Sequence, residues 1–188
     1  MAPNGGRPPI PRQGSRAGRD ENRRTIVFCL LFGAFLGAGY YLSIYAPVVE
    51  RAINPFTAFI AKVSSATLQL LGTDAHASGT RLAGRGVSFE LRNGCNGVWA
   101  TIIFVSAVLA FPSTMRAKLI GVAAGFAAIF VINLIRVLSL YYIVLHYPGA
   151  FEGAHIYVWQ SVVIGAAVLL WLLWARRAVP AARPPRGA

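Results

Sequence analysis

The stretch LIGVAAGFAAIFVINLIRVLSLYYIVL, residues 119–145, decides the fold class of this chain. A run of about 20 mainly apolar residues is long enough to cross the hydrocarbon core of a bilayer as a helix. Only Asn133 and Arg136 interrupt this run with amide or charged side chains. Together with three other apolar stretches, one of them short, it predicts an all-α integral membrane helical bundle with about four transmembrane helices. The predicted spans are 25–46, 97–111, 119–138 and 155–175.

The composition excludes an ordinary soluble domain. Hydrophobic residues make up 56% of the 188 residues and charged residues 13%, and the mean hydropathy is +0.56. Soluble domains carry about 25% charged residues. The net charge is +12, from 18 Lys and Arg against 6 Asp and Glu. Because these cations flank the apolar stretches and are not interleaved with aromatic residues, we expect membrane lipid and no nucleic acid as a partner.

The distribution of cations predicts the topology. Six arginines lie within residues 1–24, four within 176–188, and Arg116 and Lys118 lie in the link between two spans. Positive residues concentrate on the cytoplasmic side of membrane proteins, and four crossings place all of these cations there. We therefore predict that both termini are cytoplasmic, that 1–24 and 176–188 are disordered basic tails, and that 25–175 is the membrane-embedded domain.

Two further segments are predicted outside the spans. Residues 52–71 mix polar residues with apolar ones at helical spacing, which indicates one amphipathic or partly embedded helix. If this helix crossed the membrane, the downstream cations would conflict with the positive-inside pattern. Residues 80–92 alternate apolar and polar side chains and contain glycines at a turn, which predicts a small extramembrane β-hairpin.

The predicted topology brings three residues that are distant in sequence to the outer membrane face. Cys95 lies just before the second span, and His155 begins the last one. Arg136 follows Leu119 by about 26 Å of helix, which is nearly the full hydrocarbon thickness. We therefore expect a thiol, a guanidinium and an imidazole at one face.

Cys95 lies in the sequence Asn-Gly-Cys-Asn-Gly, immediately before a predicted helix. The positive end of a helix dipole lowers the pKa of a nearby thiol, and free backbone N–H groups there are suited to binding an oxyanion. The alternative is a small apolar residue in a turn. Cys29 lies inside an apolar span and is expected to be inert packing. No His or Cys cluster has metal-ligand spacing, so we expect no metal and no cofactor.

Arg136 and Asn133 are three residues apart and share a helix face that should point into the bundle. An arginine at the centre of a transmembrane helix costs about 2.5–3.5 kcal/mol on insertion scales, which favours a functional role. A snorkelling interface anchor is the alternative. His155 is suited to general acid–base work, with His146 on the same side as the alternative base.

Three motifs of this chain resemble those of the exosortase/archaeosortase family of membrane cysteine transpeptidases. Cys95-Asn96-Gly97 is similar to its Cys-x-Gly motif, Asn133 and Arg136 to its Asn-x-x-Arg motif, and His155 to its later histidine. The order and spacing agree, and the short chain resembles a compact subtype, exosortase H. Many members have about eight spans, so helices that precede the motifs in those members are missing here. Asn96 stands where serine or threonine is common.

The resemblance implies an activity on secreted proteins that end in a short motif, a transmembrane helix and a basic cluster. Cys95 would attack at the motif to form a thioester, Arg136 would stabilise the oxyanion, and His155 would transfer protons. Asn133, Asn96 and Gly97 would support the site. The cleaved protein would then pass to an acceptor nucleophile on the periplasmic face of a bacterial inner membrane.

Other functions compete with this one. The chain could be a non-enzymatic assembly factor or transporter subunit, in which Arg136 forms a structural ion pair with Glu152 or Glu90. A serine peptidase using Ser139 or Ser161 is less favoured, because no Gly-x-Ser-x-Gly is present. A redox role is less favoured still, because Cys95 is the single cysteine predicted at the outer face.

Overall fold

A computed structural model describes residues 14–178. The helices are α1 (Gly14–Ile44), α2 (Ala46–Val48), α3 (Asn54–Leu70), α4 (Val98–Ala110), α5 (Met115–His146), α6 (Phe151–Gly153) and α7 (Gln160–Ala178). Short π- or 3-10-helical turns at Val49–Ile53, Pro148–Ala150 and Ala154–Trp159 connect some of them. The strands are β1 (His76–Ser78), β2 (Arg81–Gly84) and β3 (Val87–Glu90).

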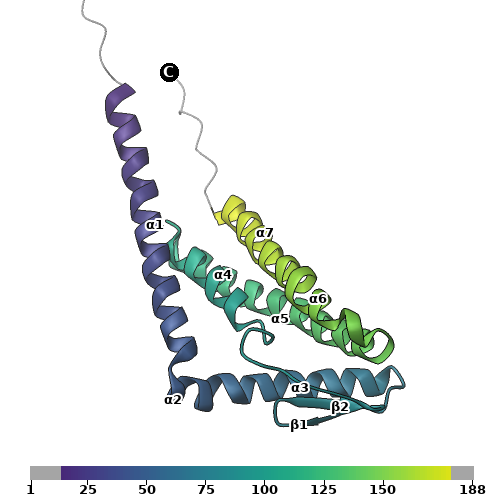
Figure 1. Ribbon diagram of the computed structural model, residues 1–188. Coiled ribbons are helices and arrows are strands. Elements are labelled where there is room, and N and C mark those ends of the chain that lie inside the picture. The colour runs from purple at the N-terminus through teal and green to yellow at the C-terminus, as the bar shows by residue number, and fades with distance from the viewer. Residues whose placement is uncertain (1–13, 179–188) are drawn as a thin grey trace, which may run out of the picture.

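The elements form a helical bundle that is closed at one end by a transverse layer. Helices α4, α5 and α7 pack against one another, and α1 leans on α4 (Figure 1). Helix α3 runs across one end of these helices, and the small sheet lies beside it. The start of α1 and the end of α7 lie at the opposite end from this layer. The two ends of the described chain are therefore on one side, as the charge pattern predicts.

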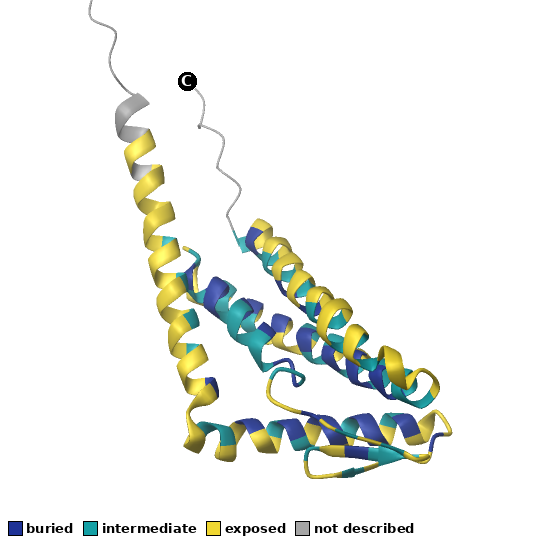
Figure 2. Ribbon diagram, in the orientation of Figure 1, coloured by how far each residue is buried: buried dark blue, intermediate teal, exposed yellow. Residues whose placement is uncertain are grey.

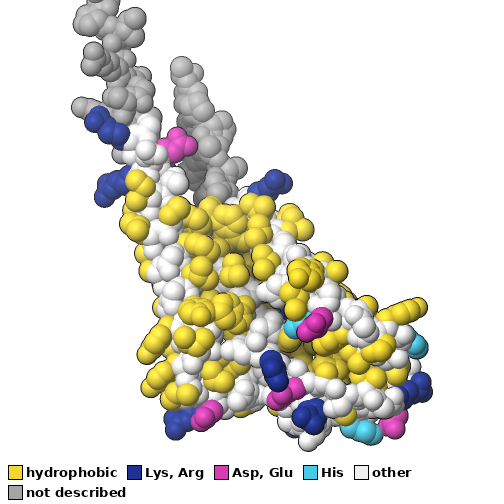
Figure 3. All heavy atoms as spheres, in the orientation of Figure 1, with side chains coloured by type: hydrophobic (Ala, Val, Ile, Leu, Met, Phe, Trp, Pro, Cys, Tyr) yellow, Lys and Arg dark blue, Asp and Glu magenta, His cyan; other side chains and the backbone are white. Residues whose placement is uncertain are grey.

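Three helical segments are long and apolar enough to cross a membrane: 21–44, 115–146 and 148–178. Large hydrophobic side chains are exposed along α1, α5 and α7, and Figure 2 shows α1 exposed over most of its length. Figure 3 shows a hydrophobic band between two ends that carry Lys and Arg side chains. Such a band suits contact with lipid, and the predicted helical membrane bundle is confirmed.

The helix bounds follow the prediction at the second span and extend into both predicted tails. The second predicted span is α4, a helix of 13 residues, and its length of about 20 Å is short of the hydrocarbon core. Pro112 and the extended backbone at Phe111 explain where it ends. Helix α1 begins at Gly14 and so includes residues 14–24 of the predicted N-terminal tail, and α7 includes residues 176–178 of the predicted C-terminal tail. The rest of the two predicted tails, 1–13 and 179–188, lies outside the described residues.

The transverse layer contains the predicted amphipathic helix and hairpin. Helix α3 buries one face, including Ile60, Ala61 and Leu68, and it is not among the helices that qualify as spans. Strands β2 and β3 pair antiparallel through a two-residue turn, in which Arg85 and Gly86 have positive φ values of 48° and 80°. This turn geometry suits the twist of a hairpin. Strand β1, which the sequence had not indicated, pairs with β2 to make a three-stranded sheet.

The small residues of α5 are used in internal packing. A Cβ at Gly121 would lie 2.2 Å from the Trp174 ring of α7, and one at Gly125 would lie 2.0 Å from the Phe104 ring of α4. The two glycines therefore let aromatic rings of neighbouring helices approach the α5 backbone. This surface of α5 is occupied by the chain itself and is not free for another helix.

Candidate active site

A short loop between β3 and α4 positions Cys95. Gly94 and Gly97, on either side, have positive φ values of 105° and 74°, a conformation that glycine adopts without strain. The Asn93 side chain donates to the carbonyl of Ser43 at the end of α1, at 2.8 Å. The Cys95 N–H donates to Arg92 O at 2.9 Å. The first bond ties the loop to α1, and the second closes the turn that carries Cys95.

Asn96 anchors the same loop to the transverse layer. Its side chain is 1% exposed and donates to Thr57 Oγ1 of α3 at 2.9 Å. Its Oδ1 accepts from the Val98 N–H at 3.2 Å, which satisfies one of the free donors at the start of α4. Asn96 thus joins the start of α4 to α3. Thr57 carries no signal in the sequence that would have identified this role.

Gly97 brings the Cys-x-Gly motif into contact with the Asn-x-x-Arg motif. A Cβ on Gly97 would lie 3.2–3.4 Å from side-chain atoms of Asn133, so the loop backbone packs directly on α5. The Asn133 side chain is 1% exposed, and its two polar atoms have no hydrogen-bond partner among the described residues. The predicted shared face of Asn133 and Arg136 is therefore turned into the protein.

Arg136 lies one helical turn further along α5 and is 2% exposed. Its guanidinium reaches two carbonyl oxygens, Gly94 O at 3.4 Å and His155 O at 3.5 Å. Within residues 14–178, Arg136 makes no ion pair with a carboxylate, and Glu90 instead pairs with the exposed Arg92 at 3.7 Å. The structural ion pair of Arg136 with Glu90 or Glu152 is thus not formed. A snorkelling arginine would reach water, and this one is buried.

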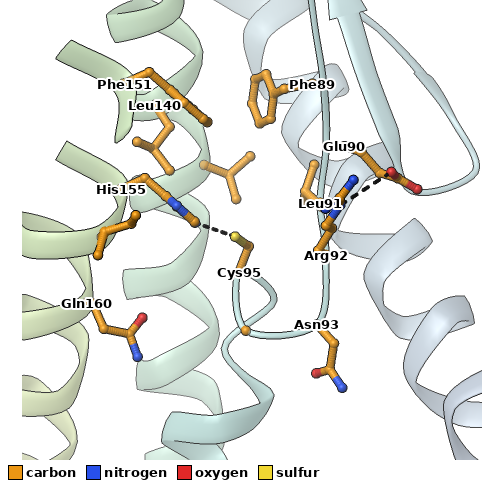
Figure 4. A pocket seen from close by; sticks show the side chains of 13 residues that line it. Phe89, Glu90, Leu91, Arg92, Asn93, Cys95, Leu140, Phe151, His155 and Gln160 are labelled. Atoms are coloured by element: carbon orange, nitrogen blue, oxygen red, sulfur yellow. Dashed lines mark hydrogen bonds and ion pairs between the residues drawn. The ribbon is translucent and has the colours of Figure 1, made fainter. Parts of the chain in front are cut away.

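His155 faces Cys95 from the other side of the site. Its Nε2 lies 2.5 Å from Cys95 Sγ, and Figure 4 shows the two side chains pointing toward one another. The ring stacks parallel to Phe151, with centroids 5.7 Å apart and an interplanar angle of 2°. His155 lies in the π-helical turn Ala154–Trp159, a distortion that is frequent at functional sites.

Cys95 and His155 open into a cavity of about 530 Å³. One wall is the chain from Phe89 to Cys95, and the other is formed by α5, α6 and the turn that contains His155. Phe89 and Phe151 contact each other across the cavity with centroids 5.9 Å apart. The cavity is large enough for several residues of a peptide and is mainly apolar in its lining.

The thiol of Cys95 differs from the prediction in its ionisation. Burial raises the pKa of the Cys95 thiol, and the positive charge of Arg136 opposes this by lowering it. The predicted lowering by the helix dipole does not prevail, because α4 begins only at Val98 and Gly97 is its N-cap. Cys95 therefore precedes the first turn, where the dipole acts most strongly. A raised pKa favours the neutral thiol, so a nucleophilic reaction at this sulfur would require a base.

The structure brings together Cys95, Arg136, His155, Asn133, Asn96 and Gly97. His146 is not near this cluster; it stacks on Tyr142 at the end of α5. The hydroxyls of Ser139 and Ser161 donate to backbone carbonyls of their own helices, at 2.8 and 2.7 Å. Phe151 also belongs to the site, because its ring stacks on His155, and the sequence reasoning missed it. Its position four residues before His155, on the same helix face, is a signal that the sequence contains.

The chain matches the family of transmembrane exosortases over residues 24–173. The match covers most of the chain, so the chain belongs to this family of membrane transpeptidases. Neither a curated protein nor a solved structure matches the chain.

Proposed function

We propose that this protein is a cysteine transpeptidase that cleaves C-terminal sorting tails of secreted proteins at the outer face of the bacterial inner membrane. The observation that carries the proposal is the contact of Cys95 Sγ with His155 Nε2 at the cavity, with the buried Arg136 behind it. A nucleophile within hydrogen-bond reach of its base is the geometry that covalent catalysis needs.

The first half-reaction forms a thioester. Cys95 Sγ attacks the scissile carbonyl carbon while its proton passes to His155 Nε2. The tetrahedral intermediate collapses, the C–N bond breaks, and the leaving amine takes that proton from His155. Because the resting thiol is protonated, His155 has to accept the proton as the Sγ–C bond forms. The tail leaves as a helix with a new N-terminus.

The second half-reaction releases the protein. An acceptor nucleophile attacks the thioester carbonyl and gives its proton to His155, and the C–S bond breaks. The departing thiolate then takes this proton, which restores the starting state. Family membership supports transfer to an acceptor over simple hydrolysis, and the acceptor is left open.

Arg136 supplies positive charge at the point where negative charge develops. Both the thiolate and the oxyanion carry charge that water would otherwise solvate. In a buried site of low dielectric, a fixed cation stabilises such charge more than it would in water. Its two carbonyl contacts at 3.4 and 3.5 Å are long, so the guanidinium retains donor capacity for a reacting oxygen.

The orientation of the protein follows from the charge pattern. Arg23, Arg24 and Lys118 border one cavity at the end where α1 begins, which places the α4–α5 link beside the basic start of α1. The positive-inside rule assigns this end to the cytoplasm. The transverse layer and Cys95 then lie on the periplasmic side, where secreted substrates arrive.

The proposal is tested by cleavage of a reporter. The reporter is a folded secreted protein fused to the C-terminal motif, apolar helix and basic cluster of a protein from the same genome. We expect Cys95→Ala and His155→Ala each to reduce cleavage at least about a hundredfold. The matched controls Cys29→Ala and His146→Ala should retain it.

A second measurement looks for the intermediate. The body of the reporter, joined through its new C-terminal carbonyl as a thioester to Cys95, should appear by mass spectrometry and disappear on treatment with hydroxylamine. Undiminished cleavage by Cys95→Ala would refute the proposed chemistry.

A further inference from the structure

The outer edge of β3 is unpaired in the sheet. The strand order is β1-β2-β3, so β3 has a neighbour on one side only. The register pairs Ser88 with Ala83 and Glu90 with Arg81, and the Leu91 N–H donates to Thr80 O at 2.9 Å. In an antiparallel ladder hydrogen-bonded pairs alternate with non-bonded pairs. The main-chain groups of Ser88 and Glu90 therefore point away from β2.

These main-chain groups are available to another strand. Both residues are exposed, and no backbone hydrogen bond of Ser88 or Glu90 to another described residue is present on this side. Unpaired edge strands are templates for an additional strand, and proteins usually blunt them with proline, a bulge or a cover. Strand β3 has neither a proline nor a bulge.

The free edge leads directly to the candidate nucleophile. The chain from Phe89 through Cys95 forms one continuous wall of the cavity, and Cys95 lies at the end of this wall beside His155 (Figure 4). Phe89 and Phe151 form an aromatic surface at the opposite end of the cavity. A strand added to β3 would therefore run along the cavity and reach the thiol.

We propose that the β3 edge binds the sorting motif of the substrate as an added β-strand, through the main-chain groups of Ser88 and Glu90. This inference rests on the proposed function and names how its substrate is held. An extended peptide is the occupant that matches the edge, because main-chain hydrogen bonds supply affinity and pockets for alternate side chains supply specificity. The Phe89–Phe151 surface receives an apolar side chain of the motif.

Proline at the outward position tests the hydrogen bonds. Ser88→Pro removes an N–H that β2 does not use and blocks the approach of another strand. The matched control is Ala77→Pro, at an outward position on the opposite edge of the sheet. We expect Ser88→Pro to reduce reporter cleavage about tenfold or more, and Ala77→Pro to retain it. If Ser88→Pro and Ala77→Pro have equal thermal stability and cleave the reporter at equal rates, the proposal is overturned.

Crosslinking tests the proposal without catalysis. In a chain with Cys29→Ala and Cys95→Ala, Ser88→Cys supplies a single thiol whose side chain lies on the exposed face of the sheet. Cysteines are placed one at a time along the motif of the reporter. Disulfide yield should alternate with a period of two, because successive side chains of a strand face opposite sides.

The outcomes separate the two proposals. Period-two crosslinking together with full cleavage by the Cys95→Ala variant would leave edge binding in place and refute the cysteine chemistry. Uniform or absent crosslinking would refute edge binding. Crosslinking of Ser88→Cys to a second copy of the chain in place of the tail would also refute it, because the edge would then be a contact between copies.

Discussion

Gly97→Ala tests whether the contact between the two motifs holds the site together. Gly97 has φ +74°, and an alanine in this left-handed backbone conformation destabilises the folded state by about 1–2 kcal/mol. Its new Cβ would also lie 3.2 Å from Asn133 Cγ, closer than ordinary contact, so the loop and α5 must separate by a few tenths of an ångström. The backbone strain affects stability, and the displacement affects the alignment of Cys95 with Arg136 and His155.

Gly72→Ala separates the two effects. Gly72 has φ +78°, nearly the same backbone conformation, but a Cβ there meets nothing within 4 Å. Both variants should unfold at a temperature about 2–8 °C lower in detergent, since each kcal/mol is worth about 2–4 °C in a chain of this size. Only Gly97→Ala should also lose tail cleavage, by about tenfold, because misplacing reacting groups by 1 Å costs about a hundredfold.

The assay is cleavage of the tailed reporter by purified enzyme, measured at a temperature at which both variants are folded. A stability loss without an activity loss in Gly97→Ala would show that the Asn133 contact does not align the thiol. Equal activity losses in the two glycine variants would show that strain anywhere in the protein has the same effect. Either result would refute the reasoning.

Three further predictions concern charge, the loop anchor and packing. Arg136→Met removes the positive charge that lowers the pKa of the buried Cys95 thiol, so this pKa should rise. In a chain with Cys29→Ala, the rate of iodoacetamide alkylation of Cys95 should then increase at a higher pH than without Arg136→Met. An unchanged pH profile would contradict the interaction between Arg136 and Cys95. Asn96→Leu removes two hydrogen bonds and should lower the free energy of unfolding by about 1–3 kcal/mol, as measured by denaturation in detergent. Gly125→Leu should destabilise by a similar amount, about 1–3 kcal/mol, because its side chain would overlap an aromatic ring of α4. Gly165→Leu, where a Cβ meets nothing within 4 Å, should leave the unfolding temperature unchanged.

The helical architecture could be predicted because lipid leaves few options. Backbone groups in the hydrocarbon must be bonded within the segment, so apolar length identifies the three long spans, 21–44, 115–146 and 148–178. The positive-inside rule then placed Cys95, Arg136 and His155 at one face. Helix α4 agrees with the predicted span 97–111 to within one residue at each end, because Pro112 marks in the sequence where this helix has to end.

Other features depend on tertiary contacts that a local pattern does not contain. Strand β1 has three residues and no periodicity of its own, and it forms because β2 pairs with it and α3 packs against it. The sequence left open whether His155 or His146 lies beside Cys95. The answer depends on how the chain turns after α5, which brings His155 to Cys95 and leaves His146 against Tyr142. The direction of the Cys95 pKa was mispredicted because the walls that bury the thiol come from residues far along the chain.

The burial of Arg136 is the strongest physical argument that the site handles negative charge. Removing a guanidinium from water costs several kcal/mol unless an anion or full hydrogen bonding compensates. Within the described part of the chain it has two long bonds to carbonyls, an Nε without a partner and no carboxylate. One group able to become an anion interacts with this charge, the thiol of Cys95, whose pKa the charge lowers. A residue that only stabilised the fold would be better replaced by an apolar one. Its retention beside a protonated thiol is explained if the missing anion forms during the reaction, first as thiolate and then as oxyanion.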